Sequence, residues 1–154
     1  MTDTVTHRQR LDIAAEAPSA FRALLLLNKT AHEGIDPKLA ELVKIRASQV
    51  NGCGFCLDMH ATDARKLGES ERRIIALPAW REVSFYTDRE CAALALTEAI
   101  TLVSETHVPD EVWQEAEKHF DATELATLVM LIGTINLWNR IGVSTRRQPP
   151  AEDE

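Results

Sequence analysis

Two cysteines and a histidine lie close together in the chain and could carry redox chemistry. Cys53 and Cys56 are separated by two residues, and His60 follows four residues after Cys56. On a helix these three side chains occupy positions i, i+3 and i+7, which lie on a single stripe. A thiolate beside a second thiol and an imidazole is what two-electron redox chemistry requires. The spacing therefore predicts a redox-active thiol pair that is served by a histidine.

The position of the cysteines in their helix favours a reactive thiolate. Asn51 and Gly52 interrupt the helical pattern just before them, so both thiols are expected in the first turn of the next helix. The unpaired N–H groups and the positive end of the helix dipole favour a thiolate there over a thiol. The imidazole of His60, one turn further on, can take a proton from Cys56 or stabilise its anion.

A carboxylate on the preceding helix is a candidate fourth member of the site. Glu41 lies ten residues before Asn51, and His60 lies eight residues after Gly52. At a rise of about 1.5 Å per residue, these separations correspond to roughly 15 Å and 12 Å. An antiparallel hairpin would bring Glu41 level with His60, where it could orient the imidazole or relay a proton through it.

The elements that position these residues are predicted to be helices throughout. Apolar residues recur at helical spacing between capping residues, glycines and prolines, and no segment alternates long enough to make a strand. We expect an all-α fold, a compact bundle of about six to eight helices. Residues 1–145 are predicted to form one domain, and the acidic tail at 146–154 is predicted to be disordered. The expected helices cover approximately residues 18–31, 37–51, 53–67, 70–77, 87–103, 109–120 and 123–142.

The last predicted helix bears on the oligomeric state. It is apolar on nearly all sides, and a small domain can rarely bury such a helix alone. We therefore expect it to lie in an interface of a homo-oligomer. Asn136, Asn139 and Arg140 near its end could line either that interface or the mouth of the active site.

Composition excludes several classes of function. The 154 residues include 17 Lys and Arg against 24 Asp and Glu, a formal net charge of −7, so nucleic acid is not expected as a partner. The most apolar stretch, 125–137, is interrupted by polar residues and is shorter than the ~20 residues that span a bilayer. The N-terminus lacks the apolar region of a secretory signal, and three cysteines do not suit a disulfide-stapled secreted scaffold. We expect a cytoplasmic protein that does not bind a membrane.

The segment from Glu41 to His60, ELVKIRASQVNGCGFCLDMH, resembles the core motif of the AhpD-like alkylhydroperoxidases. These proteins belong to the wider carboxymuconolactone decarboxylase family. The family's order of Glu, Ser, Asn, paired cysteines and His is matched at every position, and the similarity extends through residues 77–82, 97–99 and 135–140. The resemblance implies an all-helical, oligomeric peroxidase, a trimer or hexamer, without a metal or organic cofactor.

The resemblance also implies a role for each residue of the site. The cysteine nearer the histidine, Cys56, would attack hydrogen peroxide or a small organic hydroperoxide. Cys53 would then resolve the sulfenic acid as a disulfide, with Glu41 and His60 as the proton relay. An external dithiol or disulfide reductant would regenerate the thiols. Phe55 departs from the family, in which a tyrosine often lies between the two cysteines.

Other interpretations stay open from the residues alone. The same pair could serve a disulfide carrier or redox sensor without efficient peroxide turnover, or it could be a pair of buried, inert thiols or a plain disulfide. A structural zinc site is a further alternative, since Cys53, Cys56 and His60 offer three ligands. The fourth ligand would come from one of Cys91, His32, His107 or His119.

Residues outside the motif are assigned structural roles. Cys91 lies in an Ala- and Leu-rich segment and is predicted to be a buried, inert thiol. Ser48 is predicted to pack or to form hydrogen bonds rather than to act as a nucleophile. Trp80, Trp113 and Trp138 are predicted to anchor the core or an interface.

Overall fold

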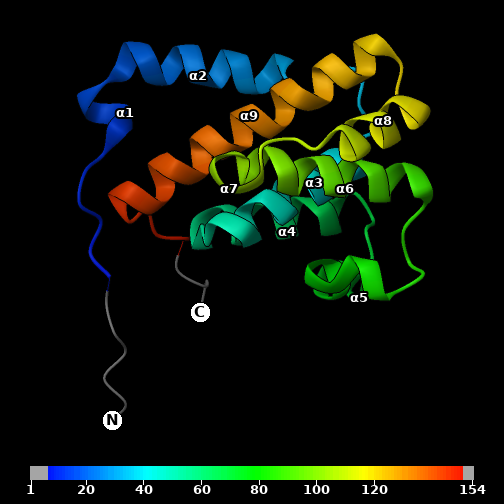
Figure 1. The fold of residues 1–154 in the computed structure, drawn as a ribbon. Coiled ribbons are helices and arrows are strands. Elements are labelled where there is room, and N and C mark those ends of the chain that lie inside the picture. Colours follow the sequence, from blue (N-terminus) through cyan, green and yellow to red (C-terminus); the bar gives the residue numbers. More distant parts are fainter. Residues whose placement is uncertain (1–6, 151–154) are drawn as a thin grey trace.

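The computed structural model describes residues 7–150, and over these residues it contains helices and no strand (Figure 1). The predicted all-α fold is confirmed. In chain order the elements are α1 (Ile13–Glu16), α2 (Pro18–Thr30), α3 (Pro37–Asn51), α4 (Gly54–Lys66), α5 (Glu71–Ala76), the 3₁₀-helix η1 (Leu77–Glu82), α6 (Asp88–Thr101), α7 (Val103–Thr106), α8 (Asp110–His119) and α9 (Ala122–Thr145).

Capping residues set most of the helix boundaries. Asp36 accepts a hydrogen bond from the backbone N–H of Leu39 at the start of α3, and Pro37 occupies the first helical position, where no N–H is needed. Gly52 ends α3 with a φ of 68°, a left-handed conformation that glycine adopts without strain. Thr87 and Glu90 form the capping box of α6.

The structure differs from the predicted boundaries in three places. The helices α1 and α7 have four residues each and are too short to show an apolar period. The chain does not leave helical structure at Pro78, because a proline near the start of η1 opens a new turn. The last helix continues past Gly142 to Thr145, and its left-handed end falls at Arg146, with a φ of 54°.

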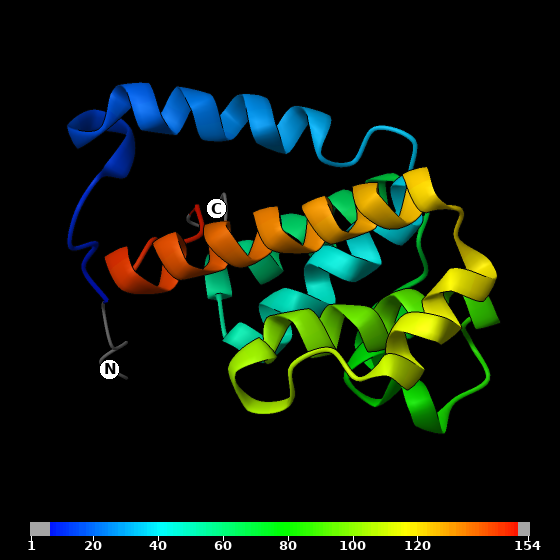
Figure 2. The ribbon, with the colours of Figure 1, turned by 45° about the horizontal axis from the view of Figure 1, so that its top comes forward.

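The long helix α9 crosses the middle of the molecule and packs on α3, α4, α6 and α8, while α2 runs along its other side (Figure 2). One group of buried apolar residues lies between α3, α6, α8 and α9. A second group lies between α3, α4, α5, η1 and α6. Because α3 contributes to both groups, nine of its 15 residues are buried.

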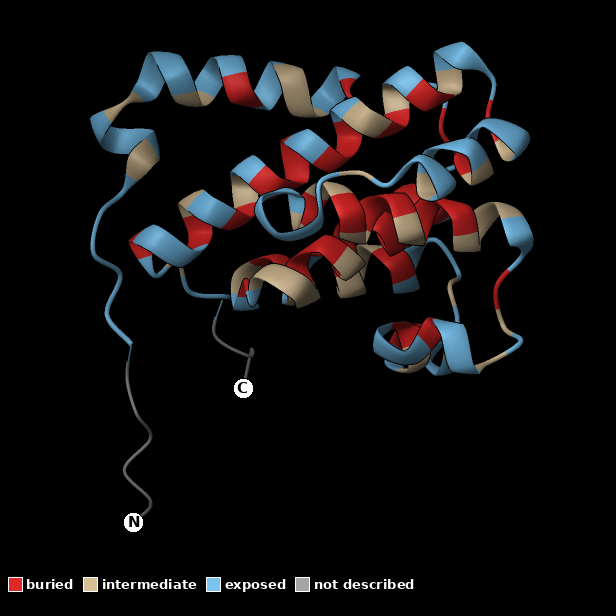
Figure 3. Ribbon diagram, in the orientation of Figure 1, coloured by how far each residue is buried: buried red, intermediate tan, exposed pale blue. Residues whose placement is uncertain are grey.

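By length and composition alone, α9 could cross a membrane, yet ten of its residues are buried inside the bundle, as expected of a core helix. Large apolar side chains nevertheless remain exposed on α9 and on its neighbour α2, which buries only Leu24. Figure 3 colours most of α2 as exposed or intermediate. The oligomer interface expected on α9 stays a prediction. The exposed apolar residues of the two helices are Leu25, Leu26, Met130, Leu137 and Val143.

The predicted disordered tail is described only in part. Residues 151–154 lie outside the described residues. Closer to α9, Arg147 donates its backbone N–H to the carbonyl of Gly142, and its guanidinium lies 4.0 Å from the centre of the Phe55 ring. The beginning of this segment therefore packs against the first turn of α4.

Candidate redox site

The paired helices α3 and α4 bring the four predicted site residues together. Cys53 is the N-cap of α4, and its sulfur accepts a hydrogen bond of 3.3 Å from the backbone N–H of Cys56. A disulfide joins these two residues, whose Cα atoms are 5.3 Å apart. Both cysteines are buried, with exposed fractions of 1% and 2%.

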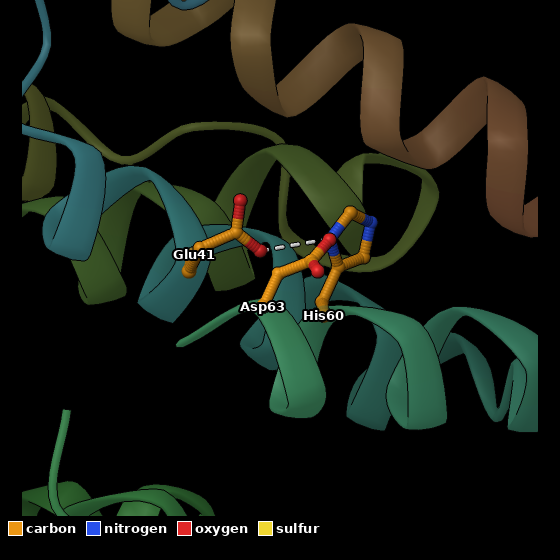
Figure 4. Close-up of side chains that lie close together, drawn as sticks. All are labelled: Glu41, His60 and Asp63. Carbon is orange, nitrogen blue, oxygen red and sulfur yellow. Dashed lines mark hydrogen bonds and ion pairs between the residues drawn. The ribbon is translucent and has the colours of Figure 1, made fainter. Parts of the chain in front are cut away.

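Glu41 and His60 face each other from the two helices. Oε2 of Glu41 lies 2.8 Å from Nδ1 of His60, and both side chains are buried (Figure 4). Because an ionised carboxylate can only accept hydrogen bonds, Nδ1 of His60 carries the proton in this pair. When the ring is neutral, Nε2 is its acceptor nitrogen and can take a proton from another group.

A buried lysine holds the other oxygen of Glu41. Nζ of Lys44 lies 2.8 Å from Oε1, and this lysine is only 6% exposed. Burial, the largest single influence, would raise the pKa of Glu41, but the hydrogen bond and charge of His60 and the charge and hydrogen bond of Lys44 together outweigh it. The pKa of Glu41 therefore lies below its ordinary value, and the carboxylate stays ionised. The available signal for Lys44 was its spacing of three residues from Glu41 on one helix.

Glu41, His60 and Asp63 are the group in the described part of the chain that could hold a metal ion. Their ligand atoms lie within 4.8 Å of one another, and Figure 4 shows the Asp63 carboxylate beside the imidazole ring. A divalent cation would meet the buried ammonium that already occupies one oxygen of Glu41. The zinc alternative required the sulfurs of Cys53 and Cys56, which are bonded to each other in this state. The cluster of Glu41, His60 and Asp63 is therefore better suited to binding and transferring protons than to binding a metal ion.

A pocket of about 180 Å³ opens onto Cys56 and His60. This volume is several times the ~30 Å³ share of one water, so the pocket can hold a small organic molecule. Trp138 is held in the wall by a hydrogen bond of 3.0 Å from Nε1 to Oδ1 of Asn28 and by edge contact with Phe21. The apolar walls come from α2, α4 and α9 and consist of Phe21, Leu25, Phe55, Met59, Trp138 and Ile141.

Gly142 of α9 lies directly against the disulfide. A Cβ atom at this position would lie 2.9 Å from Sγ of Cys53 and 3.7 Å from Sγ of Cys56. Since Cβ atoms essentially never approach another atom within 3.0 Å, any side chain here would displace the disulfide or the helix. The sequence marked Gly142 only as a helix end, although a glycine inside a helical pattern often has such a packing role.

A network of side-chain hydrogen bonds connects α3 to α9. Nδ2 of Asn51 donates to the side-chain oxygens of Asn136 and Asn139, at 3.0 and 2.9 Å. Nδ2 of Asn139 donates to Oγ of Ser48, and these two residues are completely buried. Both roles suggested for Asn136 and Asn139 were wrong, because the two side chains are buried between helices of one chain. The exposed Arg140 donates to Oδ1 of Asn136 and so stays close to its own helix.

The third cysteine, Cys91, is half-buried rather than buried. Its Sγ lies 3.9 Å from the carbonyl oxygen of Tyr86. Burial raises the pKa of its thiol, and the charges of Asp88 and Glu90 raise it further. A raised pKa disfavours the reactive thiolate, as an inert role requires.

The fold and the site together define a class, a helical protein with a buried disulfide at a helix N-terminus beside a carboxylate–histidine pair. A sequence profile of the carboxymuconolactone decarboxylase family matches residues 15–99. The chain belongs to this family and is AhpD-like, which confirms the predicted resemblance.

Individual relatives resemble the chain over different lengths. The uncharacterised protein YdfG of Bacillus subtilis is 44% identical over 137 residues, which are 88% of this chain and 93% of that protein. The crystal structure of ATU0492, a protein of unknown function from Agrobacterium tumefaciens considered a candidate AhpD antioxidant defence protein, is 38% identical. It has a TM-score of 0.92 and covers 94% of this chain and 100% of that one. Alkyl hydroperoxide reductase AhpD of Coxiella burnetii is 44% identical over 52 residues, 34% of this chain and 29% of that protein.

Proposed function

We propose that this protein is a thiol-dependent peroxidase that reduces hydrogen peroxide or small organic hydroperoxides. One observation carries the proposal. The pocket is lined by both Cys56 and His60, and Nδ1 of His60 is hydrogen-bonded to Glu41. A peroxide in this pocket would therefore meet a nucleophile and a proton carrier together.

Cys56 is the nucleophile in this proposal. In the reduced protein, Nε2 of His60 takes the thiol proton, and the N-terminus of α4 stabilises the thiolate. The thiolate attacks the terminal oxygen of the peroxide, and the O–O bond breaks. The alcohol or water leaves with the proton from His60, and Cys56 becomes a sulfenic acid.

Cys53 resolves this sulfenic acid. Its thiol attacks the sulfur of Cys56, water leaves, and the disulfide forms. Two electrons from an external dithiol then restore both thiols. Because the carboxylate of Glu41 stays ionised, it orients His60 rather than carrying a proton itself.

We also expect a homo-oligomer, because α2 and α9 expose several large apolar side chains. The trimer or hexamer is what the family resemblance implies, and the cytoplasm is the compartment we expect. No metal or organic cofactor is required for the steps described.

Peroxide consumption with a supplied dithiol tests the catalytic assignment. We expect Cys56→Ser to abolish consumption and Cys53→Ser to allow one turnover that leaves a sulfenic acid trappable by dimedone. Cys91→Ser is the matched control and should retain full activity. Full peroxide consumption by Cys56→Ser would contradict the proposal. Rapid exchange with dithiols, but oxidation by peroxide no faster than that of a free thiol, would favour the disulfide carrier or redox sensor instead.

A further inference from the structure

The disulfide has a different opening on each of its two sides. The pocket described above is lined by Cys56 and not by Cys53. A second, wider opening of about 350 Å³ is lined by Cys53 and not by Cys56, and we call it the Cys53 groove. Phe55, Gly142 and Arg147 line both openings and so form the wall between them.

The Cys53 groove is positively charged, although the chain carries a net charge of −7. Arg146, Arg147 and His7 line it, and none of the lining residues in the described part of the chain is acidic. Arg10 is anchored beside it by hydrogen bonds from its backbone N–H to Thr145 and from its guanidinium to the carbonyl of Ser144. Within residues 7–150, no ion pair is formed by the two arginines of the groove.

The chemistry of disulfide reduction distinguishes the two sulfurs. A thiolate attacks one sulfur in line with the S–S bond, and the other sulfur leaves on the far side. A thiolate that arrives through the Cys53 groove attacks Cys53, and Cys56 becomes the leaving group. Cys56 is the better leaving group, because it lines the same pocket as the imidazole of His60, which can supply its proton.

We propose that the Cys53 groove admits the reductant, and that this reductant is a small dithiol carrying a negative charge. The inference rests on the proposed function, which requires the disulfide to be regenerated. It deepens that function by placing the peroxide and the reductant at opposite openings. A small molecule is favoured over a folded protein, because Cys53 lines the groove but is only 1% exposed.

The step balances with the dithiol as the reductant. Its first thiolate bonds to Sγ of Cys53, the S–S bond of the protein breaks, and Cys56 leaves as a thiolate that takes up a proton. A second reductant thiolate attacks the reductant sulfur of this mixed disulfide and releases Cys53. It comes from the same molecule where the dithiol can close a ring of five or more atoms, and from a second molecule for a vicinal dithiol, whose ring would have only four atoms. The products are a disulfide of the reductant and the dithiol form of the protein, so two electrons have passed to the protein.

Two dithiols of the same spacing and different charge provide the test. Oxidised full-length protein is mixed with 2,3-dimercaptopropanesulfonate or with 2,3-dimercaptopropanol, and protein thiols are counted after a rapid acid quench. Rates are expressed per thiolate. We expect the sulfonate to react about fivefold faster at low salt and to lose this advantage in 1 M salt. Equal rates for the two dithiols at low salt would overturn the proposal.

Matched arginine variants locate the effect. Arg146→Gln should remove most of the sulfonate's advantage, whereas Arg72→Gln, which removes an exposed charge from the distant α5, should retain it (Figure 1). A purely structural role of Arg146 at the end of α9 would change both dithiol rates alike and leave their ratio intact. An unchanged ratio in Arg146→Gln would therefore contradict the proposal.

The attacked sulfur can be identified directly. Brief exposure to 2-mercaptoethanesulfonate, followed by acid quench and peptide mass spectrometry, should place the earliest mixed disulfide on Cys53. An adduct that forms first on Cys56 would overturn the proposal. None of these measurements uses peroxide, so their outcome is separate from that of the peroxidase assay.

Discussion

At the residue scale, the charge of Glu41 is fixed by two buried partners. Lys44 occupies one carboxylate oxygen and His60 the other, each at 2.8 Å. This arrangement directs Nδ1 of His60 toward the carboxylate and leaves Nε2 for the proton of the thiol. The ionised carboxylate is thus a structural requirement of the site as well as a chemical one.

The pH dependence of stability should reveal this charge. Because the folded pKa of Glu41 is depressed, its ionisation contributes stability that is complete above the ordinary value of 4.5 and is lost as pH falls through the folded pKa. Glu41→Gln should therefore lose less stability than wild type on acidification below pH 4.5, and Lys44→Met should be intermediate. At pH 7, Glu41→Gln should cost about 3–5 kcal/mol, because Lys44 stays buried without a counter-ion.

Urea unfolding across this pH range measures these differences. Glu111→Gln, which removes an exposed carboxylate from α8, is the control for the loss of one acidic group. If Glu41→Gln followed the wild-type pH dependence, the ionised state of Glu41 would not be what stabilises the fold.

Gly142 and Gly133 provide a matched pair on one helix. A Cβ at Gly142 would meet the sulfur of Cys53 at 2.9 Å, whereas nothing lies within 4 Å of a Cβ at Gly133. Gly142→Ala should destabilise the oxidised form and raise the reduction potential by about 30 mV or more, while Gly133→Ala should stabilise both forms by up to ~1 kcal/mol. Equilibration with glutathione buffers measures the potentials. Equal potentials in the two variants would show that Gly142 does not restrict the disulfide.

At the scale of elements, α3 and α9 hold the cysteine turn in place through amide side chains. Asn139 is completely buried and serves both Asn51 and Ser48. A buried network of this kind stabilises one arrangement only if each member keeps its partners.

Truncation of Asn139 tests that network. Asn139→Ala should lower the free energy of unfolding by about 2–4 kcal/mol, because it removes the hydrogen bonds to Asn51 and Ser48 and leaves a cavity at a completely buried position. Ser144→Ala, at an exposed position of the same helix, should change it by less than about 0.5 kcal/mol. Denaturant unfolding of the reduced proteins is the measurement, and similar values for both variants would contradict the role of the network.

The helices could largely be predicted from the sequence, whereas the surroundings of the site could not. Local hydrogen bonds and backbone conformation determine the helix boundaries at Asp36, Gly52 and Thr87, so these boundaries can be predicted from the sequence. The roles of Gly142 and Trp138 depend instead on which residues of other helices lie opposite them. A single sequence specifies such long-range neighbours only through the whole packing arrangement.

At the scale of the whole molecule, α2 and α9 expose several large apolar side chains. Leu26, Met130 and Leu137 have exposed fractions of 64%, 49% and 43%. Apolar surface of this kind is typical of a protein–protein interface, and a second copy of the chain would bury it.

Light scattering tests whether copies of the chain associate here. We expect a wild-type mass that is a multiple of 17.2 kDa and a shift toward 17.2 kDa in the double variant Met130→Glu, Leu137→Glu. Ile75→Glu, at an exposed position of α5, should leave the mass unchanged. A wild-type mass of 17.2 kDa, or dissociation by Ile75→Glu alone, would contradict this interface.

Because most of α3 is buried, its residues are less free to change during evolution than residues at the periphery of the molecule. Nine of its 15 residues are buried, and Glu41, Lys44 and Ser48 are among them. Substitutions that change the proton transfer at the site therefore also lower the stability of the fold. The walls contributed by α2 and residues 146–149 carry few buried side chains. New substrate preferences can therefore arise by drift at this periphery while the chemistry at the centre is inherited unchanged.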